Sequence, residues 1–449
     1  MSDFEFFLVF FSNSPLFLSA MFVMTGILYL SIRSLVPAAY LDPMHFFWTF
    51  TFGSAYGVVI GLFLLGQIET ELFLMVFAFG TLFIVSFRQF AKAKVSRLHR
   101  QFLKFLVPTG DGKREFLVAL TVYVALLIVI IAFVGFGMFA ETNRFEQNRG
   151  FGPLVRVADA LRLFVVAYLA LDVLKRYRAS GGMTIPTLLR VGFVLALIVL
   201  GSMVNGSKFA LLEAIYAVVL AISIYDIKPR FKVWVALSIM LTALGFAIIV
   251  LSNNLRNDAN TQGAGPEYMA GDSLVVERLF LRILANADKY YFSLPNGVIH
   301  ELKTDNVAVA FAAPFVGTGR ISALVGYNVD DLNIGRQTLT YFYPDYDIAG
   351  GPTSHFDLFA YKYFGWFFGV GFVLLVAALL AAIMLLGKSG KNKIFYASLA
   401  AAIWLRSQAV LLEPTVGLAY IFDIFILFFM LKISCAVFST QGVTIHDRA

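Results

Sequence analysis

The strongest constraint on this chain is a series of long apolar runs that carry almost no charge. Residues 116–139 and 364–386 each reach the roughly 20 residues that an α-helix needs to cross about 30 Å of hydrocarbon. The whole chain is 59% apolar and 14% charged, whereas soluble domains carry about 25% charged residues. The sequence therefore predicts an all-α polytopic membrane protein.

Polar breaks between the apolar runs predict about 11 transmembrane helices. They divide the chain into an N-terminal bundle of about 8 spans (1–252), a large loop (253–363), and about 3 C-terminal spans with a short tail (364–449). A structureless loop of that length would be unusual, so we expect it to be partly helical and functional. The predicted spans are 14–32, 46–66, 72–87, 116–139, 152–173, 187–205, 209–225, 232–252, 364–386, 394–411 and 416–434.

Lysine and arginine predict the sidedness of these spans. The loops around 88–114, 175–190, 228–232 and 388–393 are basic, whereas the alternate short loops hold only Arg144, Arg149 and Lys208. Basic loops stay in the cytoplasm, so the N-terminus and the loop 253–363 are expected outside and the C-terminus inside. The net charge of +7 then reflects loops that meet anionic lipid, not a nucleic-acid partner. The single cysteine, Cys435, excludes an intramolecular disulfide and a cysteine-based metal cluster.

Positive charges gather on the predicted outer side. Arg278, Arg282 and Lys289 fall on one face of a predicted helix within 272–294, although they could instead reach lipid headgroups or pair with neighbouring acids. Lys208 follows an Asn-Gly turn at the start of a predicted helix, where free backbone N–H groups favour phosphate. A plain tight turn with an outward-reaching lysine is the alternative.

Glycine-rich stretches at 315–337 and 347–366 add further candidates. They interleave glycines with Arg320, Arg336 and His355, and polar residues including Asp357 flank the histidine just before a predicted span. Such loops fit a backbone that wraps a ligand. A flexible cap without a ligand explains the glycines equally well but leaves the placed cations unexplained.

Arg406 lies inside an apolar run, in the predicted outer half of the span 394–411. A buried guanidinium costs at least about 2.5–3.5 kcal/mol in a bilayer, so it needs a partner: Glu413, Asp423 or a ligand. Arginine donates paired hydrogen bonds suited to phosphate. A lipid-linked diphosphate at the outer surface is the ligand that best fits the full set of cations, which is Lys208, Arg278, Arg282, Arg320, Arg336 and Arg406.

The layout and several short motifs resemble the Wzy-type O-antigen or oligosaccharide repeat-unit polymerases. The shared layout is about 11 spans, one large periplasmic loop before the last three spans, and basic cytoplasmic loops. The motifs are NGSK at 205–208, FVGTGR at 315–320, GGPTSHFDLFAYKYFG at 350–365 and the LR of IWLR at 405–406. Many members carry arginine where this chain has Lys208. The resemblance covers roughly 200–435.

The resemblance implies a GT-C-like glycosyltransferase of the bacterial inner membrane. It would transfer a growing glycan from undecaprenyl diphosphate to the non-reducing end of a new lipid-linked unit, on the periplasmic side, alongside a chain-length-regulating co-polymerase. The six cations would bind the diphosphate, and no cofactor is expected. For the catalytic base we favour His355, followed by Asp357, Glu277 or Glu413.

Three other functions remain open at this point. An O-antigen ligase uses the same donor but transfers glycan to lipid A–core, a lipid-linked oligosaccharide transporter would carry charges through the membrane midplane, and a non-catalytic scaffold would not need the cations. Paired acids at 330–331 and at 345 and 347 could hold Mg²⁺. With this many cations a divalent ion is not needed, so we expect no metal.

Overall fold

The computed structural model describes residues 1–93, 101, 105–108, 110–137, 150–205, 209–225, 283–345, 351–387 and 393–446. Every regular element in these ranges is a helix. The chain divides into two compact units: unit 1 holds 1–92, 238–381 and 408–418, and unit 2 holds 93–237, 382–407 and 419–449. The two units group residues that contact one another, whereas the predicted boundaries at 252 and 363 separate the apolar runs from the long loop. Those boundaries stay a prediction.

Eight helices within the described ranges are long and apolar enough to cross a membrane. The chain is therefore a polytopic helical membrane protein, as the apolar runs predict. The predicted span 152–173 forms α8 (Gly152–Ala179), and the span 209–225 forms the shorter α10 (Ala210–Ile224). The predicted span 232–252 lies outside the described residues, so the total of about 11 stays a prediction. The eight are α2 (Ser14–Ile32), η2 with α3 (His45–Phe52, Gly53–Leu64), α4 (Thr70–Ala91), α6 (Lys113–Phe133), α9 (Ile185–Asn205), α18 (Phe356–Gly387), α19 with α20 (Ile394–Ser407, Ala409–Leu412) and α21 (Pro414–His446).

In unit 1, α2 and α3 pack at very short range. Gly53, Gly57 and Gly61 recur every four residues along α3, and a Cβ atom at Gly57 would fall on the backbone of Met21. Small residues at this spacing let helix backbones approach closely in a membrane, where van der Waals packing drives helix association. The α2–α3 pair is thus closely packed, and α3 supplies Tyr56 to the polar network described below.

The described part of the long predicted loop begins at residue 283 and forms a series of short helices in unit 1. The N-terminal helix α1 (Asp3–Ser12) lies against them: Tyr291 donates a hydrogen bond of 2.6 Å to the Asp3 carboxylate, Tyr343 donates one of 3.2 Å, and the Phe6 and Tyr291 rings stack at 4.0 Å. The first helix is therefore tied to these short helices by its side chains, whereas the sidedness of the spans stays a prediction. The short helices of this part are η4 (Ala285–Ala287), α13 (Asp288–Ser293), η5 (Pro295–Gly297), α14 (Val298–Glu301), α15 (Val307–Val316), α16 (Thr318–Val325), η6 (Val329–Leu332) and α17 (Ile334–Phe342).

Helix α18 is interrupted at Gly365. Its backbone angles (φ 66°, ψ −169°) lie in a region open essentially to glycine alone. Beyond this point the chain folds back, because the rings of Phe359 and Phe364 pack on Phe372 at 5.4 and 5.1 Å. Residues 354–364 thus form a short arm, distinct from the apolar helix 366–387. This arm carries Ser354, His355, Asp357 and Tyr363 of the candidate site.

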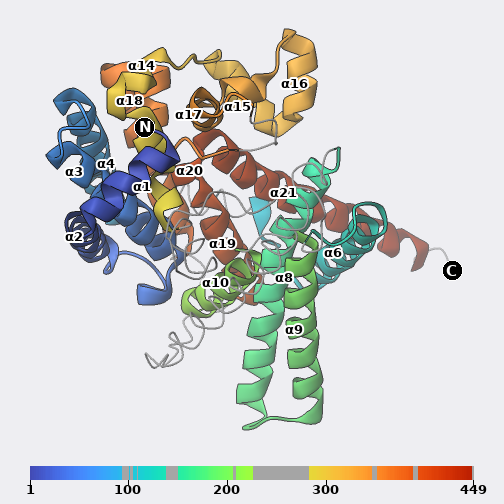
Figure 1. Ribbon diagram of the computed structural model, residues 1–449. Helices are drawn as coiled ribbons and strands as arrows, with labels where there is room; N and C mark the ends of the chain where they lie inside the picture. Colours follow the sequence, from blue (N-terminus) through green and yellow to red (C-terminus); the bar gives the residue numbers. More distant parts are fainter. Residues whose placement is uncertain are drawn as a thin grey trace, which may run out of the picture. The chain divides into compact units, whose positions relative to one another are not determined.

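Unit 2 contains α6, α8, α9, α10, α19 and most of α21. Figure 1 shows α8 and α9 side by side, joined by a short turn. Phe164 of α8 packs edge-on against Phe395 and Phe428 at 4.9 and 4.6 Å. The buried Arg162 of α8 donates to Glu213 of α10 at 2.7 Å. This ion pair links α8 to α10. Removing one of its partners would leave the other charge buried without a partner, which is strongly destabilising.

Candidate functional site

A buried polar network fixes the arm of α18 to the rest of unit 1. Tyr290 lies 3.0 Å from Nδ1 of His355, and its hydroxyl donates to Asp357 at 2.7 Å. Tyr56 of α3 donates to the same carboxylate at 2.9 Å, and Lys289 Nζ lies 3.1 Å from His355 Nε2. All five side chains are buried. Buried polar groups of this kind must be hydrogen-bonded to be tolerated, and here each has a partner.

The hydrogen bonds of this network run in one direction. Lysine has only donors, so Nε2 of His355 accepts from Lys289 and Nδ1–H donates to the oxygen of Tyr290, whose hydroxyl donates to Asp357. Burial, followed by the nearby Lys289, lowers the pKa of His355 well below its ordinary value, which agrees with a neutral imidazole. The ammonium of Lys289 is paired with Asp288 at 3.1 Å.

The backbone of His355 is also unusual. Its φ of 51° is left-handed, which is uncommon outside glycine. The residue is held there by its backbone N–H, which donates to the carbonyl of Leu412 at 2.8 Å, and by its ring, which stacks on Phe52 at 4.4 Å. Residues locked in such conformations cluster at functional sites. His355 lies in the buried network, whereas its neighbour Ser354 lines a cavity.

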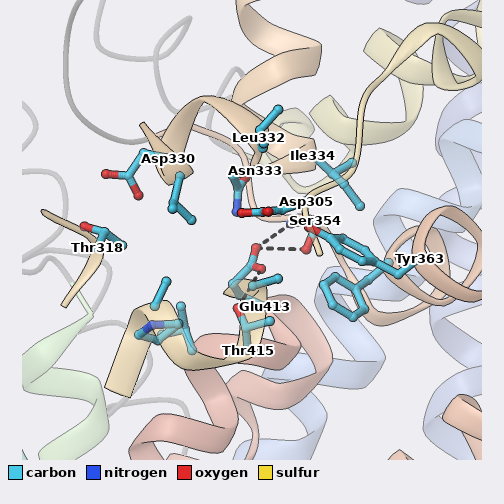
Figure 2. Close-up of a pocket in the computed structure, with 16 residues that line it drawn as sticks. Asp305, Thr318, Asp330, Leu332, Asn333, Ile334, Ser354, Tyr363, Glu413 and Thr415 are labelled. Carbon is cyan, nitrogen blue, oxygen red and sulfur yellow. Dashed lines mark hydrogen bonds between the residues drawn. The ribbon is translucent and has the colours of Figure 1, made fainter. Parts of the chain in front are cut away.

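Ser354 lines a cavity in unit 1, shown in Figure 2. The cavity has a volume of about 90 Å³, enough for several water molecules. Its polar wall is acidic, and among the residues that the structure describes no lysine, arginine or histidine lines it. The polar lining residues are Asp305, Thr318, Asp330, Asn333, Ser354, Tyr363, Glu413 and Thr415.

Glu413 lies at the centre of the polar wall. Its Oε2 accepts hydrogen bonds of 2.9 Å from both the backbone N–H and the hydroxyl of Ser354 (Figure 2). Burial raises the pKa of Glu413 above its ordinary value, against the opposing effect of these hydrogen bonds. A carboxylate with a raised pKa at a cavity wall is suited to accept a proton from a bound hydroxyl group.

The predicted bases therefore differ in their surroundings. His355 and Asp357 are fully buried in the network and do not line the cavity, so the geometry gives them a positioning role for the arm. Glu413 is the predicted base that does line the cavity. Glu277 lies outside the described residues, and its role stays a prediction.

Arg406 is buried in unit 2, with 6% of its surface exposed. Its guanidinium carbon lies 3.9 Å above the ring of Tyr420, a favourable cation–π contact. Asp423, one of its expected partners, instead pairs with Arg156 at 3.1 Å. Within the described part of the chain Arg406 has no carboxylate oxygen within 4.0 Å, and its Nε has no hydrogen-bond partner. The guanidinium retains donor capacity for a ligand.

Two further predicted diphosphate-binding cations, Arg320 and Arg336, are described, and neither lines the cavity. Arg320 is exposed on α16, and Arg336 on α17 pairs with Asp331 at 3.3 Å. Lys289, expected on a cationic ridge, instead points into the buried network. Lys208, Arg278 and Arg282 lie outside the described residues. A single site formed by all six cations stays a prediction.

The sequence also offers paired acids that could hold Mg²⁺, although no metal is expected. Of the acids considered for Mg²⁺, Asp347 lies outside the described residues, and Asp331 pairs with Arg336. In the ranges that the structure describes, no three His, Cys, Asp or Glu side chains are placed to hold a metal ion.

Sequence reasoning missed Tyr56, Tyr290, Asp305 and Asn333. The two tyrosines contact Asp357 across sequence separations of 301 and 67 residues, so no local pattern marks them. Comparison with protein families, with curated proteins and with solved structures finds no match to this chain. The functional assignment therefore depends on the residues themselves.

Proposed function

We propose that this protein is a membrane glycosyltransferase that polymerises oligosaccharide repeat units linked to undecaprenyl diphosphate. It would act on the periplasmic side of a bacterial inner membrane, with a chain-length-regulating co-polymerase as partner, and build an O-antigen or a related surface polysaccharide. The observation that carries the proposal is the cavity in which a half-buried carboxylate, Glu413, lies among hydroxyl and amide groups. Such a cavity, with a few converging polar groups, is suited to bind an acceptor sugar.

The proposed reaction replaces one bond at the anomeric carbon of the donor glycan. The bond from this carbon to the diphosphate oxygen breaks, and its electron pair leaves with the diphosphate. The acceptor hydroxyl oxygen forms the new bond, and its proton passes to Glu413. General-base assistance of this kind contributes about 10²–10⁴ in rate.

Arg406 keeps the role of binding the diphosphate. Its buried guanidinium, with an unpartnered Nε in the described part of the chain, supports this role because arginine forms paired hydrogen bonds with phosphate oxygens. Neutralising the charge that develops on a leaving group contributes about 10²–10³ in rate for each donor.

The test is a reconstituted reaction in proteoliposomes with purified lipid-linked repeat units, run with and without a chelator. We expect a ladder of polymer lengths from the unaltered protein. Arg406→Ala and Glu413→Gln should lower the rate by the factors given above while the protein remains inserted. Arg176→Ala and Asp331→Asn are matched controls, because both residues are surface ion-pair members.

Two outcomes would overturn the proposal. Absence of polymer from correctly inserted protein and competent substrates would exclude polymerase activity, and full-length ladders from Arg406→Ala would remove the diphosphate role. A parallel reaction with lipid A–core as acceptor identifies a ligase, since a ligase makes a single transfer to that acceptor and leaves repeat units unpolymerised.

A transporter of lipid-linked oligosaccharides is the second candidate. It is favoured by the charged groups inside unit 2, where Arg162 contacts Asp159 and Glu213, and Arg156 contacts Asp423. Charges in apolar bundles often mark transport paths. Movement of labelled lipid-linked sugar across the vesicle membrane without new glycosidic bonds would identify this activity.

A further inference from the structure

The cavity of unit 1 has a one-sided charge. Asp305, Asp330 and Glu413 supply three carboxylates to its wall, and no basic side chain of the described segments lines it. The charged groups that a diphosphate would meet on this wall are all of like sign, and like-charge juxtaposition disfavours binding. The cavity is therefore unsuited to the donor's leaving group and suited to a molecule that offers hydrogen-bond donors.

Asp305 has unused capacity toward such a ligand. The residue is 8% exposed, and its Oδ1 accepts from the backbone N–H of Asn306 at 2.7 Å and from the hydroxyl of Tyr327. Its Oδ2 is buried and has no hydrogen-bond partner in the described part of the chain. Figure 2 shows Asp305 beside Asn333 and Ser354, above Glu413. An unpartnered buried carboxylate oxygen is costly, and a ligand hydroxyl or ammonium group would satisfy it.

The apolar part of the wall fits a ring. Phe359 and Tyr363 both line the cavity, and their rings stack on each other at 4.3 Å. The volume of about 90 Å³ corresponds to roughly six to nine water-sized positions, which is the scale of one monosaccharide. Carboxylates with an adjacent aromatic wall can bind the hydroxyl groups and the apolar face of a sugar together. As far as the structure describes the chain, these carboxylates are not placed to share a metal ion.

We infer that this cavity binds the terminal sugar of the acceptor and accepts it only when that sugar carries no negative charge. A neutral or an amino sugar donates to Asp305, Asp330 and Glu413, whereas a uronic acid is repelled by all three. The role of the bound sugar as acceptor rests on the proposed function. The charge preference of the cavity can be measured without any reaction. Rejection of the wrong ligand by an unpaired or like charge is a general source of specificity.

The test measures binding of free methyl glycosides to the full chain in nanodiscs by saturation-transfer NMR. The probes are methyl glucoside, methyl glucosaminide and methyl glucuronide. We expect the glucosaminide to bind at least about tenfold more tightly than the glucuronide, with the glucoside between them. In the double variant Asp330→Asn, Glu413→Gln this ratio should fall toward one. Asp331→Asn, which changes an acid that does not line the cavity, should leave it unchanged.

Equal binding of the three probes, or a ratio that the double variant leaves intact, would overturn the inference. The single substitution Asp305→Asn offers a second measurement, because it removes one carboxylate while keeping the size of the side chain, and it should lower the affinity for the glucosaminide. The polymerisation assay is separate. Polymer formation without charge-selective binding removes this inference alone, whereas selective binding without polymer removes the proposed function.

Discussion

Substitution of Gly365 by alanine should disturb the arm that carries the candidate site. The backbone of Gly365 has φ 66° and ψ −169°, a region essentially restricted to glycine. A Cβ atom there would meet nothing within 4 Å, so steric contact with neighbours adds nothing to the cost. The expected penalty is the backbone strain alone, about 1–3 kcal/mol.

Thermal unfolding in detergent measures this penalty. At about 2–4 °C per kcal/mol for proteins of moderate size, Gly365→Ala should lower Tm by roughly 2–12 °C. Gly371→Ala is the matched control: it lies in the same helix, its Cβ would also meet nothing within 4 Å, and its φ is not positive. Replacing a helical glycine by alanine is expected to stabilise by about 0.5–1 kcal/mol.

The comparison of the two variants decides the matter. A Gly365→Ala protein that melts at or above the temperature of Gly371→Ala would show that the chain does not turn back at this position. The same variant should also lose polymer formation in the reconstituted reaction, because relief of the strain requires the arm with Ser354 and His355 to move.

Three further predictions concern the buried polar groups. Tyr290→Phe removes the hydroxyl between the histidine and the aspartate of the network and should cost about 1–3 kcal/mol in unfolding free energy, whereas Tyr177→Phe, at an exposed position, should have no effect. Arg162→Met strands two carboxylates and should cost about 3–5 kcal/mol; the exposed pair of Arg176 contributes less than about 1 kcal/mol, so Arg176→Met serves as its control in the same melting assay. Burial raises the pKa of Glu413 above its ordinary value of 4.5, so the folded state favours the protonated carboxyl group. The contribution of this group to stability is therefore lost as pH rises through the raised pKa. Base-assisted activity increases over the same pH interval, because the carboxylate is the form that accepts a proton. Glu413→Gln should abolish that rise in the pH–rate profile, and an unchanged profile would remove the base role.

The apolar runs are sufficient to predict the class of fold and most helix positions. The predicted span 14–32 coincides with α2, and 187–205 differs from α9 by two residues at one end. The reversal at Gly365 could not be predicted, because a glycine within an apolar run is also common in uninterrupted membrane helices. The distinction depends on the backbone angles of one residue, which packing of Phe359 and Phe364 on Phe372 determines.

The candidate site was predictable only where polar residues interrupt an apolar pattern. His355, Asp357 and Glu413 stand out for that reason. Helical periodicity groups Lys289 with Arg278 and Arg282, and pairing with a neighbouring acid is the alternative that the Lys289–Asp288 ion pair matches. The contact of Lys289 with His355 spans 66 positions, so no local pattern could predict it. The role of Asp305 depends on a cavity formed by segments distant in sequence, and no local pattern reports such a cavity.

The contacts of Asp3 have a consequence for biogenesis. Its partners Tyr291 and Tyr343 are synthesised 288 and 340 residues later, after several helices have already entered the bilayer. The first helix must therefore wait until that distant segment is synthesised, and pairings of such long sequence separation form slowly. Completion of unit 1 is thus a late event in synthesis, and a ribosome stalled before residue 291 would leave the N-terminal helix without its partner.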